Sequence, residues 1–242
     1  MNAKGKTSIK ESKPKMSASA LSRLAGVSAV LAGLCFIIIG LFHQLNIPSS
    51  VATAAWINVH IAATALGFFG LFGMAGLYAR QVETSGWLGL IGFLLFSLWM
   101  TIVTGFSFVE AFFLPQLATV SPAFVENILG MFSSVPGTID LGVLPTLWNL
   151  SGVLIILGPL LFGIATFRAR VLSRWAGGLL AFAAVLVPLG GMVPAEYQPE
   201  FIMIPLGLAI AWMGYALVSE RRETSVESVV ANSAQPVLGK TA

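Results

Sequence analysis

Two histidines and one glutamate are the residues of this chain best suited to chemistry. His43 and His60 are the only histidines, seventeen positions apart, and Glu110 follows a long apolar segment. Two imidazoles and a carboxylate with one open position would suit a catalytic zinc ion. Two histidines alone could supply the axial ligands of a haem. The residue types fit either cofactor, although the spacing matches no specific metal-binding motif.

The same residues could instead line a pocket for a small molecule. Trp56 is typical of a membrane–water interface, and His60 lies one helical turn deeper, about 6 Å, on the same face. Ionisable groups within a membrane are costly and indicate a functional site. The expected ligand-binding residues at this outer rim are His43, Asn58, His60, Glu110, Trp148 and Asn149. A purely structural role, with a neutral histidine ring bonded to a neighbouring helix, is the alternative.

The composition predicts that lipid surrounds most of the chain. Of the 242 residues, 57% are hydrophobic and only 10% are charged, and the mean hydropathy is +0.89. A soluble domain has about 25% charged residues and, at this length, buries only about 70% of its unfolded surface. The apolar surface therefore exceeds what one soluble core can hide.

Six apolar segments are long enough to cross a bilayer, which takes about 20 helical residues. They are bounded by Trp, Tyr, Arg or His, the residues typical of membrane interfaces. We expect an all-α membrane bundle with spans at about 23–43, 57–78, 87–110, 148–167, 175–193 and 201–218, which make up a transmembrane domain over 20–219.

The basic residues predict the orientation of this bundle. With six spans, all 13 Lys and Arg fall on one side, which is cytoplasmic by the positive-inside rule. Both termini are then cytoplasmic, in a cell (inner or plasma) membrane. Segments 1–19 and 220–242 are polar and are predicted to be disordered tails. The basic N-terminal tail is interpreted as an orientation signal near anionic lipid, with no nucleic-acid partner.

One external segment separates the third and fourth spans. Between residues 113 and 147, Ser121 and Pro122 are typical of an N-cap followed by proline at the first helical position. Glu126 would lie in that helix and Gly130 would end it. We expect one or two short amphipathic helices here, on the outer surface or covering the bundle.

Glycines are spaced as in helix–helix contacts, where small residues let two backbones approach closely. This pattern predicts contacts through Gly67, Gly70, Gly73, Gly86, Gly89 and Gly92. Cys35, the single cysteine, lies in an apolar run and is interpreted as a packing residue.

Known motifs exclude several enzyme classes. The chain has no H-E-x-x-H zinc motif after His60, no P-loop and no dinucleotide fingerprint. Its only aspartate, Asp140, lies in the external segment, whereas aspartyl intramembrane proteases need aspartates within the membrane. Between their ends, the predicted spans contain no Asp, Glu, Lys or Arg. This charge-free interior favours an uncharged ligand over an ion.

With "LSRLAG" at the first span, "WINVH" at the second and "GLYARQ" before the third, the chain resembles small six-helix bacterial inner-membrane proteins of unassigned activity. This resemblance implies a fold and a compartment, and no reaction. We expect a non-enzymatic membrane protein that binds or passes a small uncharged molecule through an outward-facing pocket. The alternatives are a membrane partner subunit, with a homo-oligomer or another membrane protein as its partner, and a metal- or haem-dependent enzyme using His43, His60 and Glu110.

Overall fold

The computed structural model describes residues 17–135, 137–190, 192–193 and 199–233. These residues form helices and connecting loops without any strand, which confirms the predicted all-α class. The elements are α1 (Ala18–Phe42), α2 (Pro48–Val51), α3 (Ala54–Phe112), α4 (Leu114–Val120), α5 (Pro122–Phe132), α6 (Leu144–Ala169), α7 (Arg174–Gly190), η2 (Pro199–Ile202) and α8 (Met203–Ser233).

Within the described ranges, four helices are long and apolar enough to cross a membrane, fewer than the six spans predicted. They are Ala18–Phe42, Ala54–Phe112, Leu144–Ala169 and Glu200–Ser219. The difference has two sources. The predicted spans 57–78 and 87–110 both lie within α3. The predicted span 175–193 corresponds to α7, whose 17 residues extend only about 26 Å.

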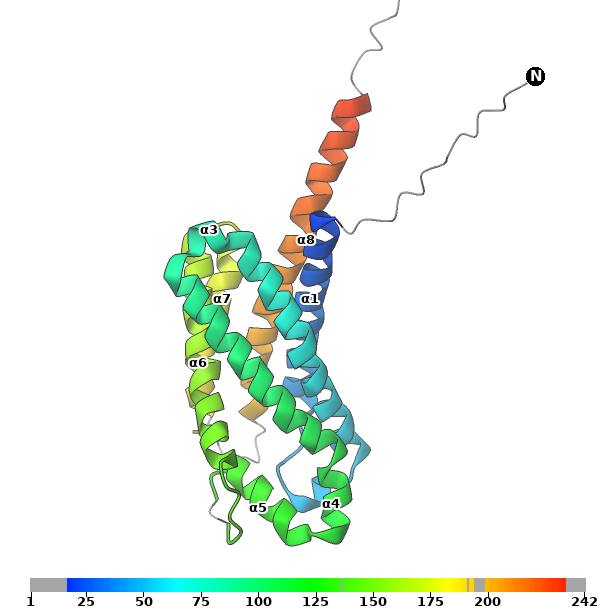
Figure 1. Cartoon of the computed structure of the whole chain (residues 1–242), viewed down its shortest axis with the longest axis vertical. Helices are drawn as coiled ribbons and strands as arrows, with labels where there is room; N and C mark the ends of the chain where they lie inside the picture. Colours follow the sequence, from blue (N-terminus) through cyan, green and yellow to red (C-terminus); the bar gives the residue numbers. More distant parts are fainter. Residues whose placement is uncertain (1–16, 136, 191, 194–198, 234–242) are drawn as a thin grey trace, which may run out of the picture.

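The long helix α3 reverses direction at Gly86. A straight helix of its 59 residues would extend about 90 Å, but Gly86 has φ 56° and ψ −160°, a region essentially restricted to glycine. Figure 1 shows residues 54–85 and 87–112 as two arms that run in opposite directions. The predicted helix contact at Gly86 is therefore wrong, because a Cβ there would have nothing within 4 Å.

Other glycines do bring the helices close together. A Cβ on Gly26 of α1 would lie 2.9 Å from the carbonyl oxygen of Gly214 in α8. A Cβ on Gly73 of α3 would lie 2.7 Å from the Cα of Ala29 in α1. Gly92 is pressed in the same way against the backbone of α6. The predicted contacts at Gly73 and Gly92 are confirmed. Gly26 and Gly73 explain how α1 packs closely against both α8 and α3.

The bundle has an apolar interior and a largely apolar exterior. Phe36, Phe96 and Phe162 are fully enclosed in the main core. Large apolar side chains are also exposed on the long helices, among them Phe68, Phe72, Leu94, Leu98, Val153, Phe182 and Trp212. Water would not favour such a surface, whereas hydrocarbon would. The exposed apolar side chains are consistent with a membrane protein.

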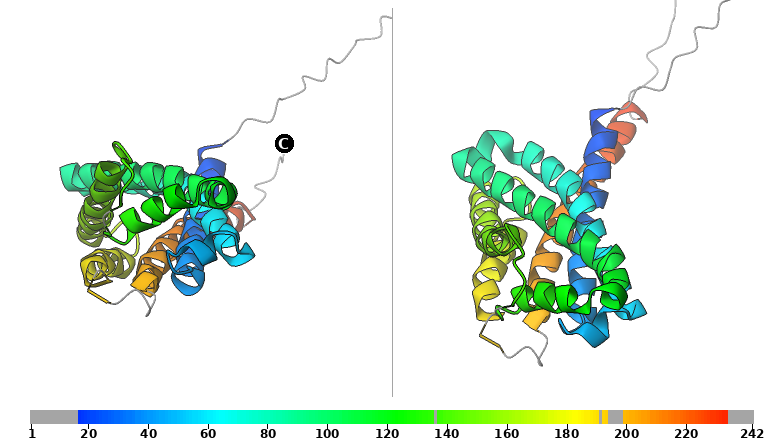
Figure 2. Two further views of the ribbon diagram at one scale, coloured as in Figure 1. Left: turned by 90° about the horizontal axis from the view of Figure 1, so that it is seen from below. Right: turned by 60° about the horizontal axis from the view of Figure 1, so that its bottom comes forward.

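One end of the bundle is closed by α2, α4 and α5, which we call the cap. Figure 2 shows α5 lying across the ends of the long helices. Val51 of α2, Leu114 of α4 and Ile128 of α5 form a second apolar core around Trp56. Trp56 is thus fully buried, whereas the sequence predicted it as a residue that marks the membrane–water interface. The helix predicted after Ser121 is α5, which starts with Pro122 and ends at Phe132 rather than at Gly130.

The opposite end holds the Gly86 reversal, the start of α1 and the connection from α6 to α7 (Figure 1). Ser17 caps α1, because its side chain accepts a hydrogen bond from the backbone N–H of Ala20 at 3.1 Å. The helix therefore begins inside the predicted 1–19 tail, of which residues 1–16 lie outside the described residues. α8 continues to Ser233, so the first part of the predicted 220–242 tail is helical, and 234–242 lie outside the described residues.

Candidate functional site

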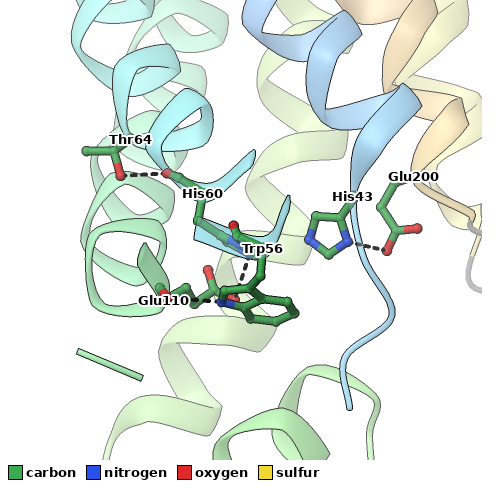
Figure 3. A network of polar contacts seen from close by, with 6 residues as sticks. All are labelled: His43, Trp56, His60, Thr64, Glu110 and Glu200. Atoms are coloured by element: carbon green, nitrogen blue, oxygen red, sulfur yellow. Dashed lines mark hydrogen bonds and ion pairs between the residues drawn. The ribbon is translucent and has the colours of Figure 1, made fainter. Parts of the chain in front are cut away.

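A buried polar network lies beneath the cap, formed by residues from three parts of the chain (Figure 3). His60 and Glu110 come from opposite arms of α3. His43 is the C-cap of α1, and Glu200 lies in η2. The reversal at Gly86 is what returns Glu110 to the level of His60, fifty residues earlier in the chain. Three of the predicted site residues, His43, His60 and Glu110, are therefore brought together.

The centre of the network is His60, whose ring is buried. Its Nδ1 lies 2.8 Å from the backbone carbonyl oxygen of Trp56, one helical turn earlier. Its Nε2 lies 3.4 Å from Oε1 of Glu110. Thr64 donates its hydroxyl to the carbonyl of His60 at 2.9 Å. Both ring nitrogens of His60 thus face oxygen atoms, in a place that the cap shields from solvent.

Trp56 connects the two arms of α3 at this level. Its indole N–H donates to the backbone carbonyl of Glu110 at 3.0 Å, and that carbonyl belongs to the last turn of the helix, where intrahelical donors run out. The ring centres of Trp56 and His60 are 4.2 Å apart. The sequence placed Trp56 on the same face as His60 but did not predict that its indole would cap the helix end that bears Glu110.

His43 joins the network from the side of α1. Its ring centre is 5.1 Å from that of His60, in an edge-to-face arrangement, and its Nδ1 lies 3.5 Å from Oε1 of Glu200. That nitrogen is enclosed but makes no hydrogen bond, so the Glu200 contact is an ion pair only when His43 is protonated. Burial lowers the pKa of His43, and the Glu200 and Glu110 carboxylates oppose that shift while His60 adds to it.

Glu200 is a network residue that the sequence analysis missed. It precedes the last apolar segment and lies far from His43 in the chain, so no local pattern links the two. Its only sequence signal is its type, since it is one of few acidic residues at this end of the molecule. The contact depends on α1 packing beside α8.

A cavity of about 400 Å³ opens elsewhere at the capped end, between α5, the following loop and the start of α6. It contains two further predicted residues, Trp148 and Asn149, with Asn127, Met131, Asp140 and Pro145 among the other lining residues. None of His43, His60 or Glu110 lines it. The single pocket expected from the sequence is thus divided into a buried network and a separate cavity.

The polar walls of this cavity are held in place by backbone contacts. Asn127 donates its amide to the carbonyl of Ala123 at 2.7 Å and accepts from the N–H of Ile139 at 2.9 Å. Asp140 Oδ1 accepts from the N–H of Gly142 at 2.8 Å. Asn149 is exposed on α6. The loop is therefore fixed to α5, and the cavity has preformed polar walls.

Trp148 supplies the aromatic wall of the cavity. Its ring is half-buried and packs against Phe132, with 4.7 Å between the ring centres, and against Phe106 at 5.6 Å. Asn58, the remaining predicted residue, is exposed on α3 and does not line this cavity.

The predicted zinc and haem sites need ligands that converge on one point. Among the residues that the structure describes, no group of three or more His, Cys, Asp or Glu side chains is arranged to hold a metal ion. His60 and Glu110 are adjacent, whereas His43 presents its ring edge to face with His60 and its Nδ1 toward Glu200. A zinc or haem cofactor stays a prediction.

Comparisons with known proteins return nothing that resembles this chain. No protein family model matches it, no curated protein matches it, and no solved structure matches it.

Proposed function

We propose that this chain is a multi-pass protein of a bacterial inner membrane that crosses the bilayer six times, with both termini in the cytoplasm. Each arm of α3 is long enough for one crossing of about 30 Å. α7 is about 26 Å long, which is slightly shorter than the hydrocarbon layer of the bilayer. Local thinning of the bilayer can make up such a difference. The two arms of α3 and α7, together with α1, α6 and α8, give six crossings. Every Arg that the structure describes then lies at the end opposite the cap.

We further propose that the protein binds or passes a small, polar molecule without net charge at its outward-facing, capped end. The observation that supports this proposal is the cavity that contains Trp148 and Asn149, with a volume of about 400 Å³. Binding sites for small molecules are typically 300–1,000 Å³, with a few polar groups among apolar ones.

The lining residues suggest the chemistry of the ligand. The Asp140 carboxylate and the amides of Asn127 and Asn149 would exchange hydrogen bonds with hydroxyl or amide groups. Trp148 offers an apolar ring face. Neutral polyols, sugars and small amides match this combination better than anions do, because no Lys or Arg lines the cavity.

A matched pair of asparagine variants tests this proposal. The full chain in detergent is screened by thermal shift against neutral polyols, monosaccharides and small amides. Asn149→Ala removes an exposed amide in the cavity, and Asn58→Ala removes an exposed amide outside it. A compound that stabilises the wild type should stabilise Asn58→Ala equally and bind Asn149→Ala about tenfold more weakly, the equivalent of about 1.4 kcal/mol.

Two outcomes of this screen would overturn small-molecule binding in the cavity. One is that no neutral compound of these classes shifts the melting temperature. The other is that both alanine variants respond alike.

The metal- or haem-dependent enzyme at His43, His60 and Glu110 remains the alternative function. The adjacency of His60 and Glu110, 3.4 Å apart, is the observation in its favour. A visible spectrum and a metal analysis of the purified protein would separate the two, since a Soret band or stoichiometric metal would support the enzyme. A fixed protein that co-purifies would instead support a partner subunit.

A further inference from the structure

A second cavity, of about 280 Å³, lies between the reversal of α3 and the end of α6. Both of these segments are at the end of the bundle opposite the cap (Figure 1). The lining of this Gly86 cavity includes Ser85, Gly86, Trp87, Leu88 and Arg168. None of these residues lines the cavity at the capped end. The Gly86 cavity is therefore a separate candidate site.

One wall of the Gly86 cavity is the start of a long helix. The second arm of α3 begins after Gly86, whose backbone angles are not helical. The first N–H groups of a helix have no acceptor within that helix, and they form the positive end of its dipole. Two residues of this first turn, Trp87 and Leu88, line the cavity. Such a wall favours a negatively charged ligand.

The hydroxyl group of Ser85 is an independent indication of a ligand in the same cavity. Ser85 lines the cavity and is only 7% exposed. Its Oγ is buried and makes no hydrogen bond with any described residue, and a buried hydroxyl without a partner is costly. A Cβ on Gly89 would collide with this Oγ, so the hydroxyl lies against the first turn of the second arm. An acceptor atom bound at that turn would receive the hydrogen bond that Ser85 lacks within the protein.

Arg168 gives the cavity its charge. It is the only charged residue among the described residues that line the cavity, and its side chain forms no ion pair within the described part of the chain. Glu83, the acidic residue nearest to the reversal in the sequence, is exposed on α3 and does not line the cavity. A guanidinium group binds phosphate oxygens well, because its planar N–H donors match two of them at once.

The tryptophans at this end indicate the source of the anion. Trp87 lines the cavity and is 78% exposed, and Trp175 at the start of α7 is 64% exposed. Exposed tryptophans at helix ends are typical of the headgroup region of a bilayer. Basic pockets between membrane helices at the cytoplasmic face bind anionic headgroups. We propose that the Gly86 cavity binds the phosphate group of an anionic phospholipid.

In this arrangement, Arg168 and Ser85 donate hydrogen bonds to the phosphate oxygens, and the first N–H groups of the second arm face the same phosphate. The bound lipid links the reversal of α3 to the end of α6, so it stabilises the folded bundle. The inference rests on the proposed membrane bundle, because this end must lie among lipid headgroups. It does not require a ligand at the capped end.

Thermal unfolding of the full chain in lipid-free detergent tests the source of the phosphate. The melting temperature is measured with increasing phosphatidylglycerol, phosphatidylcholine or inorganic phosphate. Phosphatidylglycerol should raise the melting temperature of the wild type more than the other two compounds do. Equal stabilisation by phosphatidylcholine would overturn the preference for an anionic lipid. Equal stabilisation by inorganic phosphate would overturn the lipid as the source of the anion.

A matched pair of arginine variants tests the site itself. Arg168→Gln and Arg23→Gln each remove one exposed positive charge at the same end of the bundle, but Arg23 does not line the cavity. Arg168→Gln should bind phosphatidylglycerol about tenfold more weakly than the wild type, because hydrogen bonds between charged groups are lost. Arg23→Gln should bind it as the wild type does. Equal affinities of the two variants would overturn the site.

Ser85→Ala separates a role in binding from a role in folding. Without lipid this variant should be at least as stable as the wild type, because the lost hydroxyl makes no hydrogen bond with the described residues. Its affinity for phosphatidylglycerol should be about three- to tenfold lower. An unchanged affinity, or a loss of stability in the absence of lipid, would contradict the role of Ser85.

The two proposed binding sites can fail separately. Asn149 does not line the Gly86 cavity, so Asn149→Ala should bind phosphatidylglycerol as the wild type does. A response to phosphatidylglycerol without any response to neutral compounds would overturn only the site at the capped end. The opposite result would overturn only the lipid site.

Discussion

At the scale of single residues, the candidate site depends on which side-chain atoms lie close together more than on residue type. His60 has the backbone carbonyl oxygen of Trp56 2.8 Å from its Nδ1 and the carboxyl group of Glu110 3.4 Å from its Nε2. Trp56 packs its ring against His60 and donates its indole N–H to the backbone carbonyl of Glu110. Trp56, which the sequence predicted at the membrane interface, lies instead in the apolar core of the cap.

His43 should make the stability of the protein depend on pH. Burial lowers its pKa below the ordinary histidine value, so between that lowered value and about 6.5 the unfolded chain binds a proton that the folded one does not. Stability should therefore fall as the pH falls through this window, and it should be fully present above it. Thermal unfolding of wild type and His43→Gln in detergent from pH 7.5 downward measures this effect.

The His43→Gln variant separates the contribution of His43 to the pH dependence of stability from that of other titrating groups. His43→Gln should lose part of the pH dependence in this window, because glutamine does not titrate. If wild type and His43→Gln lose stability in parallel, the burial of His43 does not determine the pH response.

At the scale of elements, one glycine decides how α3 is arranged. Gly86 is the only residue with non-helical backbone angles inside the 59-residue helix. Without that reversal, Glu110 would lie far from His60, and the polar network could not form. The cap depends on the same reversal, because it returns α4 and α5 to the end where Trp56 lies.

Two glycine variants isolate the contribution of backbone conformation. A Cβ at Gly86 or at Gly105 would have nothing within 4 Å, and only Gly86 has a positive φ. Gly86→Ala should destabilise the protein by about 1–3 kcal/mol through backbone strain. Gly105→Ala should be neutral or stabilising by up to about 1 kcal/mol, since alanine favours a helix.

Denaturant or thermal unfolding in a fixed detergent measures both variants. Equal stability of the two would mean that the chain tolerates another conformation at Gly86. A large loss in Gly105→Ala would mean that this position has neighbours in the folded protein that the structure does not show.

At the scale of the whole molecule, the arrangement separates a basic end from a capped end. Arg23 begins α1, Arg80 lies near the Gly86 reversal, and Arg168, Arg170 and Arg174 lie around the connection from α6 to α7. The acidic residues Glu110, Asp140 and Glu200 lie toward the other end. In a bacterial inner membrane this distribution predicts that the capped end faces outward.

Single-cysteine labelling of intact cells tests this orientation. The background is Cys35→Ser, which removes the only cysteine. Ser133→Cys places an exposed thiol after α5, and Glu83→Cys places one beside the Gly86 reversal. A membrane-impermeant maleimide should label Ser133→Cys in intact cells and label Glu83→Cys only after the cells are opened. The reverse pattern, or equal labelling of both, would invalidate the six-crossing topology.

By itself, the sequence determined the all-α class and the positions of the long apolar segments, because hydropathy is a local property that any stretch of 20 residues displays. It also placed His43 and Glu110 at the outer rim of the predicted bundle, with His60 one helical turn deeper, because all three lie near the ends of apolar segments. It did not identify Glu200 or the burial of Trp56, because both depend on contacts between segments far apart in the chain. Nor could it divide the predicted pocket, as residues at one depth can belong to different sides of a bundle. Only the packing of α1, α3 and α8 determined which polar groups meet, because a buried hydrogen bond requires two specific atoms within about 3 Å, and no local pattern encodes that distance.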